Sequence, residues 1–115
     1  MKILERRFID FNHPAKYPHR EPFSVHAASI AFLDDAEPYI ACFGGSREGA
    51  PDVSIYIHHG GKNIIIGADD EVPRWNPILF NMYGELYLIE KKGIFCDRWQ
   101  TSIHRLTDVS FSKGL

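Results

Sequence analysis

The chain contains only two cysteines, Cys42 and Cys96, among its 115 residues. Two cysteines are too few for the disulfide framework that holds many small secreted proteins together. Each lies in an apolar segment that has the composition of a β-strand. We therefore expect both to be buried thiols and not a disulfide.

The sequence also lacks a long hydrophobic run and an excess of basic residues. No apolar stretch approaches the length of a membrane-spanning helix, so we expect no membrane association. Thirteen Lys and Arg residues stand against 15 Asp and Glu residues, for a formal net charge of -2. This balance provides no basic field for nucleic acid. The first residues, MKILERR, become charged before an apolar signal core can form, and we expect a cytoplasmic protein.

Helical periodicity is scarce, and turn residues separate short apolar or alternating segments. Residues 1–25 contain prolines at 14, 18 and 22, and we expect an irregular N-terminal arm there, within a single domain spanning 1–115. The pattern after the arm predicts strands at residues 27–33, 39–43, 53–57, 64–66, 77–80, 85–90 and 99–106.

These strands group into one four-stranded meander at 27–67 and most of a second at 77–106. Meanders that repeat at roughly 40–50 residues are typical of a β-propeller, in which each blade is a four-stranded antiparallel sheet. The prediction is an all-β propeller fragment of about two blades, with a small sandwich or barrel as the alternative. An unclosed ring exposes an apolar face, which favours self-association or a partner chain that supplies the missing blades.

Two turn-rich segments concentrate the chemically useful side chains, FGGSREGAPDV at 43–53 and PRWNP at 73–77. Arg47 can pair bidentately with a carboxylate or with hydroxyl groups. Glu48 and Asp52 are acids that can exchange protons. Trp75 offers a ring face on which a sugar can stack. These groups favour a shallow site for a polar, ring-shaped ligand.

Three motifs occur in the order HAASI at 26–30, FGGSREGAPDV at 43–53 and WNPILF at 75–80. Together they resemble the N-terminal part of the sialidase-like (neuraminidase, BNR-repeat) β-propeller enzymes, which are glycoside hydrolases. The resemblance implies a fragment of a glycan-processing enzyme that binds a glycan or oligosaccharide and uses no cofactor. It also implies that Asp52 is the general acid/base. The nucleophilic tyrosine and two further arginines of sialidases belong to later blades, so we expect the chain alone to be inactive.

His26 is where the sequence departs from the sialidase pattern. Sialidases have there the first of three arginines that clamp the carboxylate of sialic acid, and a single histidine cannot reproduce a bidentate guanidinium. This argues against sialic acid specificity. Relatives that cleave uronate- or rhamnose-containing polysaccharides, by hydrolysis or elimination, use a catalytic histidine, and His26 is similar to theirs.

Each candidate also has a structural interpretation that the sequence leaves open. Asp52 is common at turns because it bonds the backbone, and Arg47 and Glu48 can form a surface ion pair of little consequence. Trp75 and His26 can be core residues, while Asn76 can bind ligand or fix the loop before Pro77. The function is correspondingly open to a non-catalytic carbohydrate-binding or assembly module.

The histidines do not predict a metal site. His13, His19 and His26 have none of the short spacings of zinc motifs, and we expect no bound metal. We do expect five candidate residues to converge on one end of the blades, because the segments that carry them share an end in an up-and-down meander: His26, Arg47, Glu48, Asp52 and Trp75.

Overall fold

A computed structural model describes residues 24–33, 37–67 and 71–106, which form two antiparallel sheets. The first sheet has the order β1-β2-β3-β4 and the second β5-β6-β7. The strands are β1 (Ser24–Ala31), β2 (Tyr39–Gly45), β3 (Ser54–His59), β4 (Lys62–Ile66), β5 (Arg74–Met82), β6 (Glu85–Lys92) and β7 (Gln100–Arg105). A short 3-10 helix, η1 (Cys96–Arg98), precedes β7. The expected all-β class and its two meanders are confirmed.

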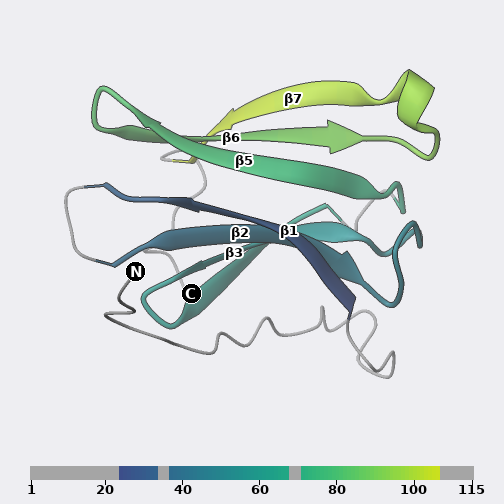
Figure 1. The fold of residues 1–115 in the computed structure, drawn as a ribbon, viewed down its shortest axis with the longest axis horizontal. Coiled ribbons are helices and arrows are strands. Elements are labelled where there is room, and N and C mark those ends of the chain that lie inside the picture. Colours follow the sequence, from purple (N-terminus) through teal and green to yellow (C-terminus); the bar gives the residue numbers. More distant parts are fainter. Residues whose placement is uncertain (1–23, 34–36, 68–70, 107–115) are drawn as a thin grey trace, which may run out of the picture.

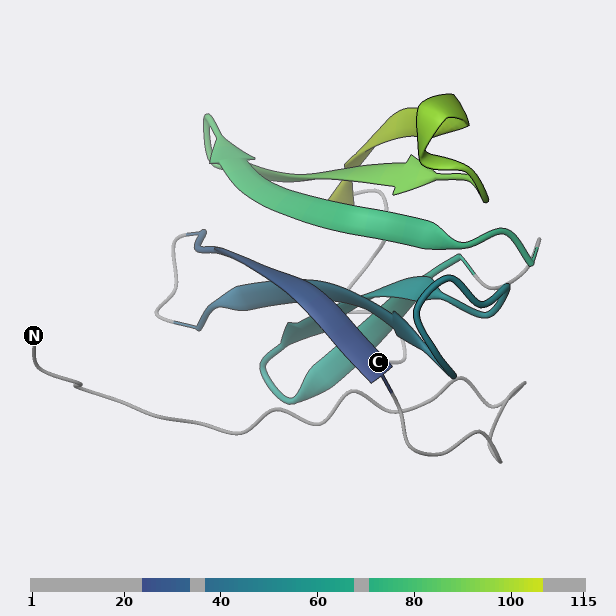
Figure 2. The same cartoon turned by 45° about the vertical axis from the view of Figure 1, so that its right-hand side comes forward.

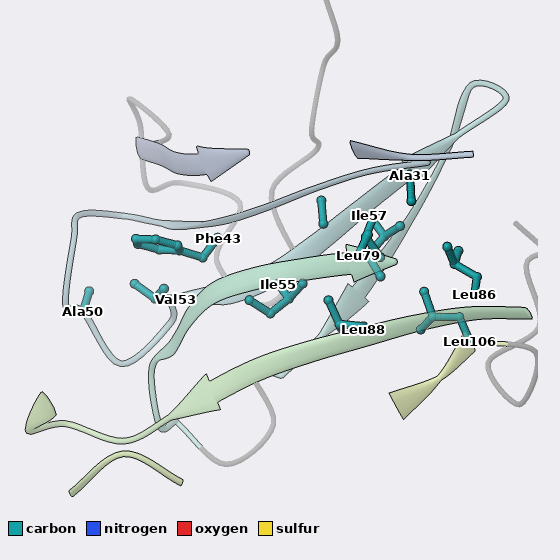
Figure 3. Close-up of a cluster of buried hydrophobic side chains, with 11 residues drawn as sticks. Ala31, Phe43, Ala50, Val53, Ile55, Ile57, Leu79, Leu86, Leu88 and Leu106 are labelled. Atoms are coloured by element: carbon teal, nitrogen blue, oxygen red, sulfur yellow. The ribbon is translucent and has the colours of Figure 1, made fainter. Parts of the chain in front are cut away.

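The two sheets lie face to face as separate layers in both views, with β5 against the first sheet (Figures 1 and 2). Alternation along the strands sends every second side chain into the space between the layers. Burial of these apolar side chains is the main force that holds the sheets together. Figure 3 shows the resulting core, formed by Ala31, Ala41, Phe43, Ala50, Val53, Ile55, Ile57, Leu79, Leu86, Leu88 and Leu106. Within the described residues the sheets do not close into a ring.

A two-residue turn sets the register of the hairpin formed by β3 and β4. Gly60 and Gly61 connect the paired residues His59 and Lys62, and both glycines have positive φ, 56° and 77°. Two successive residues at positive φ give a turn whose twist matches that of paired strands. β3 and β4 therefore extend up to this turn, past the strands predicted at 53–57 and 64–66.

The first strands of the two sheets carry the same irregularity. In β1 the register passes from His26↔Phe43 to Ser29↔Ala41, so two residues lie opposite one. In β5 it passes in the same way from Trp75↔Lys91 to Ile78↔Ile89. The first extra residue has positive φ in both strands, 55° at Ala27 and 46° at Asn76. The second sheet thus repeats the first, and His26 corresponds to Trp75.

Several boundaries differ from the sequence predictions. β1 begins at Ser24, so residues 24 and 25 belong to a strand and not to the expected arm, and Trp75 lies inside β5, not before it. Cys42 is buried as predicted, but the prediction for Cys96 is wrong, because Cys96 is exposed in η1, away from both sheets. Residues 1–23 and 107–115, with His13 and His19, lie outside the described part.

Candidate functional site

The loop between β2 and β3 is fixed by two successive turns. Ala50 N donates to Arg47 O at 3.2 Å, and Val53 N donates to Ala50 O at 3.0 Å. Ala50 and Val53 belong to the buried core, which anchors the loop from below. Gly49 has a φ of 80°, a conformation that other residues adopt only at a cost. The β2–β3 loop therefore has a defined position at the end of the sheets.

Asp52 is buried inside this loop, with only 1% of its surface exposed. Each carboxylate oxygen accepts a hydrogen bond from Ser46 N at 3.1 Å, and Oδ1 also accepts one from Ser46 Oγ at 3.0 Å. A buried carboxylate needs such donors to offset its lost hydration. Asp52 therefore makes the contacts of an aspartate that fixes a turn, which was the structural alternative to a catalytic role.

The close approach of Asp52 to the backbone explains the glycine at position 45. A Cβ at Gly45 would lie 2.7 Å from Asp52 Oδ1 and 3.0 Å from the backbone of Val53. The carboxylate occupies the space that a side chain at 45 would fill. The second glycine of the FGGSREGAPDV motif thus serves the packing of the loop.

Arg47 and Glu48 are exposed on the outer side of the same loop. Within the described residues no ion pair joins the two side chains. The surface pair considered from the sequence is not formed there. Both charges face solvent, where a ligand can reach them.

Trp75 is half-buried and packs on three sides. Its Nε1 donates to Gly93 O at 2.7 Å. Its ring meets Phe43 edge-on, with centroids 5.5 Å apart, and stacks on Trp99 at 5.1 Å. A Cβ on Gly49 would lie 3.7 Å from Trp75 Cη2, so the indole also touches the β2–β3 loop. Trp75 is consequently a packing residue with part of its surface exposed.

Asn76 is exposed beside Trp75 and occupies the bulge of β5, with a φ of 46°. Asparagine tolerates this left-handed conformation better than most residues. The backbone therefore accounts for the residue type at this position. Its exposed amide is still available to a ligand.

His26 occupies the corresponding position in β1 and is half-buried. Its Nε2 lies 2.9 Å from Ser24 Oγ, and its ring stacks on Phe43 with centroids 5.3 Å apart. The histidine is thus held by a side-chain hydroxyl and an aromatic ring.

Phe43 joins the two aromatic residues into one cluster, with His26 on one side and Trp75 on the other. Phe43, Ala50 and Val53 lie together at one end of the core, opposite Leu86 and Leu106 (Figure 3). His26, the β2–β3 loop and Trp75 therefore lie at the same end of the two sheets. This placement is the one expected from the sequence, and it tests no chemical role.

Sequence reasoning missed Trp99, which stacks on Trp75 and lies behind Gly93, where a Cβ would come within 3.1 Å of Trp99 Cδ1. It also missed a buried ion pair within the second sheet. Arg74 Nη1 contacts Glu90 Oε1, and His104 Nε2 lies 3.3 Å from the same oxygen. Glu90 has the parity of the buried Leu86 and Leu88 in β6, which was the available signal.

Two buried acidic groups near the loop have raised pKa values. Burial raises the pKa of the Cys42 thiol from 9.0 to about 12. Burial also raises the pKa of Tyr56, with smaller effects from the negative charges of Asp52 and of Cys42. Both groups stay protonated and neutral near pH 7, so neither is prepared to act as a nucleophile.

Comparison with protein-family models, with curated proteins and with solved structures finds no match for this chain. In residues 24–33, 37–67 and 71–106, no three His, Cys, Asp or Glu side chains gather as a metal site would require. Over the same residues no helix has the length and apolar character needed to cross a membrane.

Proposed function

We propose that this chain forms the first blades of a sialidase-like β-propeller and carries a glycan-binding site at the end of its sheets. The observation that carries the proposal is the meeting of three separate segments at one end, namely the start of β1, the β2–β3 loop and the start of β5. These are the segments that hold the three motifs of the resemblance.

The repeated architecture supports the propeller part of the proposal. Blades of a propeller are successive antiparallel sheets that repeat one design around an axis. The second sheet repeats the bulge of the first at the same register position and packs face to face with it. A sandwich gives no reason for such a repeat.

The exposed side chains of the β2–β3 loop and of the start of β5 support an acidic sugar as ligand. Arg47 presents an exposed guanidinium, which can bind a carboxylate with two parallel hydrogen bonds. Glu48, next to it in the sequence, and Asn76 are also exposed and offer an acceptor and an amide for hydroxyl groups. The exposed part of Trp75 can pack against the apolar face of a sugar ring.

Catalysis is the less direct part of the proposal. The resemblance assigns the acid/base role to Asp52, which would have to exchange its contacts with Ser46 for contacts with substrate. His26 is the second candidate. A non-catalytic carbohydrate-binding module is the alternative function, and the burial of Asp52 favours it. For both functions we propose that this chain alone does not cleave a glycan.

Binding of a uronate oligosaccharide, followed by NMR chemical-shift titration, tests the proposal. We expect Arg47→Ala to weaken binding by about tenfold or more, since a hydrogen-bonded charge contributes roughly 1.5–3 kcal/mol. A neutral oligosaccharide of the same length should bind the variant and the original chain alike. Arg105→Ala is the matched control, because Arg105 lies in β7 opposite Tyr87, far from the loop.

Two results would contradict the proposal. Equal losses of binding in Arg47→Ala and Arg105→Ala would show that the ligand does not bind specifically at this end of the sheets. Turnover of a glycan by the purified chain, abolished in Asp52→Asn, would show that the catalytic set is already present.

A further inference from the structure

The second sheet has an exposed apolar outer face. Ile78, Ile89 and Ile103 are cross-strand neighbours on β5, β6 and β7. By alternation they point away from Leu79 and Leu88, which face the core. Ile78 is 53% exposed and Ile103 is 66% exposed. A row of large apolar side chains across three strands is unusual for a surface that only meets water.

The internal repeat shows what this outer face corresponds to. With His26 aligned to Trp75, Ser29 and Ala41 of the first sheet align with Ile78 and Ile89. The next strand along aligns Ile57 with Ile103. The first-sheet residues lie on the inner face, where Ser29 Oγ accepts a hydrogen bond from Leu79 N at 3.0 Å. The outer face of the second sheet is therefore the equivalent of the surface that already holds β5.

The chain also exposes the matching surface. β5 contributes Leu79 to the interface, where it is 5% exposed. The residue of β1 that aligns with Leu79 is Ile30, which points outward and is 59% exposed. Val25 is on the same side, because the bulge after His26 inserts one residue, and it is 41% exposed. Phe32, two positions after Ile30 and just past the end of β1, is 52% exposed. The outer side of β1 thus repeats the side of β5 that docks on the first sheet.

We propose that copies of this chain associate head to tail, with the outer side of β1 in one copy packed on Ile78, Ile89 and Ile103 of the next. The contact repeats between copies the packing that joins the two sheets within a copy. Such a heterologous contact closes into a ring when its rotation permits. Two to four copies would bring roughly four to eight sheets together, the range over which rings of sheets close. The proposal depends on register and exposure, and it is independent of glycan binding.

Analytical ultracentrifugation of the purified chain and three variants tests the proposal. The original chain should form concentration-dependent oligomers. Ile103→Glu and Ile30→Glu should each remove the oligomers, because each places a charge in the proposed contact. Ile94→Glu is the matched control, since Ile94 is 68% exposed but lies outside the strands, and it should assemble like the original chain.

Mixing the two disrupted variants separates this contact from other modes of association. Ile103→Glu retains an intact β1, and Ile30→Glu retains an intact outer face on the second sheet. A head-to-tail contact predicts that an equimolar mixture forms a dimer containing one copy of each, which misfolded variants could not do. Assembly of Ile30→Glu alone would instead indicate contacts between two second sheets and would overturn the proposal. A monomeric original chain would overturn it too and leave the faces to a different polypeptide.

Discussion

Burial decides what single residues of the candidate site can do. Asp52 and Arg47 are five positions apart, yet one carboxylate is enclosed by the loop and the other side chain faces solvent. The first fixes the loop through Ser46, and the second is available to a ligand. The sequence predicted a chemical role for both positions, because residue type alone does not show which side chain is buried.

Loss of the Asp52 carboxylate should destabilise the protein. Asp52→Ala leaves Ser46 N without its acceptor inside the loop, and an unsatisfied buried donor costs about 1–3 kcal/mol. Ser46→Ala removes only the hydroxyl contact and should cost about 1 kcal/mol or less. Urea unfolding followed by circular dichroism measures both. Equal stability of Asp52→Ala and the original chain would show that the loop does not depend on this carboxylate.

Cys42 should make stability depend on pH in the alkaline range. Its thiol has a pKa of about 12 in the folded protein, against 9.0 for an ordinary thiol. Ionisation therefore favours the unfolded chain. The free energy of unfolding should be constant below about pH 9 and fall as pH rises towards 12, by up to about 1.4 kcal/mol per pH unit for one group.

Chemical denaturation at several pH values measures this slope in the original chain and in two variants. Cys42→Ala should reduce the slope. Tyr56 still contributes in this variant, because its pKa is also raised. Cys96→Ala should retain the slope, since that thiol is exposed. Rapid modification of both cysteines by a thiol reagent in the folded protein at pH 8 would contradict the burial of Cys42.

At the scale of strands, a buried ion pair links β5, β6 and β7. Glu90 is fully buried and lies beside Arg74 of β5 and His104 of β7. Glu90 Oε2 has no hydrogen-bond partner among the described residues. Arg74 also passes close to the end of β4, since a Cβ on Gly67 would lie 2.9 Å from Arg74 Cγ. The pair therefore fixes the start of β5 against both sheets.

Breaking this pair should cost more than replacing it. Glu90→Gln removes the buried carboxylate that contacts the largely buried guanidinium of Arg74, for a loss of about 3–5 kcal/mol. The double variant Arg74→Met/Glu90→Leu removes both charges of this pair and should recover most of that loss. Thermal and urea unfolding compare the three proteins. A double variant less stable than Glu90→Gln would show that the pair stabilises the sheets by itself.

The sequence was most informative about strands and least informative about partners. Alternation and glycine turns predicted the two meanders, because both signals are local. The parity of Glu90 in β6 could have shown that it is buried, but its partner lies sixteen positions away in another strand. Trp99 likewise meets Trp75 only after β5, β6 and η1 have folded together. Side chains that meet across strands cannot be paired from spacing alone.

At the scale of the whole molecule, the two sheets bury apolar residues on their inner faces and leave other apolar residues exposed on their outer faces. The inner sides are covered by each other, while Ile30 on one outer side and Ile103 on the other remain 59% and 66% exposed. Their register equivalents in the other sheet, Leu79 and Ile57, are buried where the sheets meet. Ile30 and Ile103 therefore lie in the positions of interface residues, but on faces that the opposite sheet does not cover.

The strand order has a consequence for how the chain reaches this structure. Within each sheet, every strand pairs with its neighbour in sequence, so each hairpin closes a short loop at a small entropic cost. Contacts between the layers join distant positions, such as Ser29 and Leu79. Loop-closure entropy is thus concentrated in the meeting of the two sheets, and contacts of this kind slow folding. The hairpins can form first, and the docking of β5 onto the first sheet is then the late step.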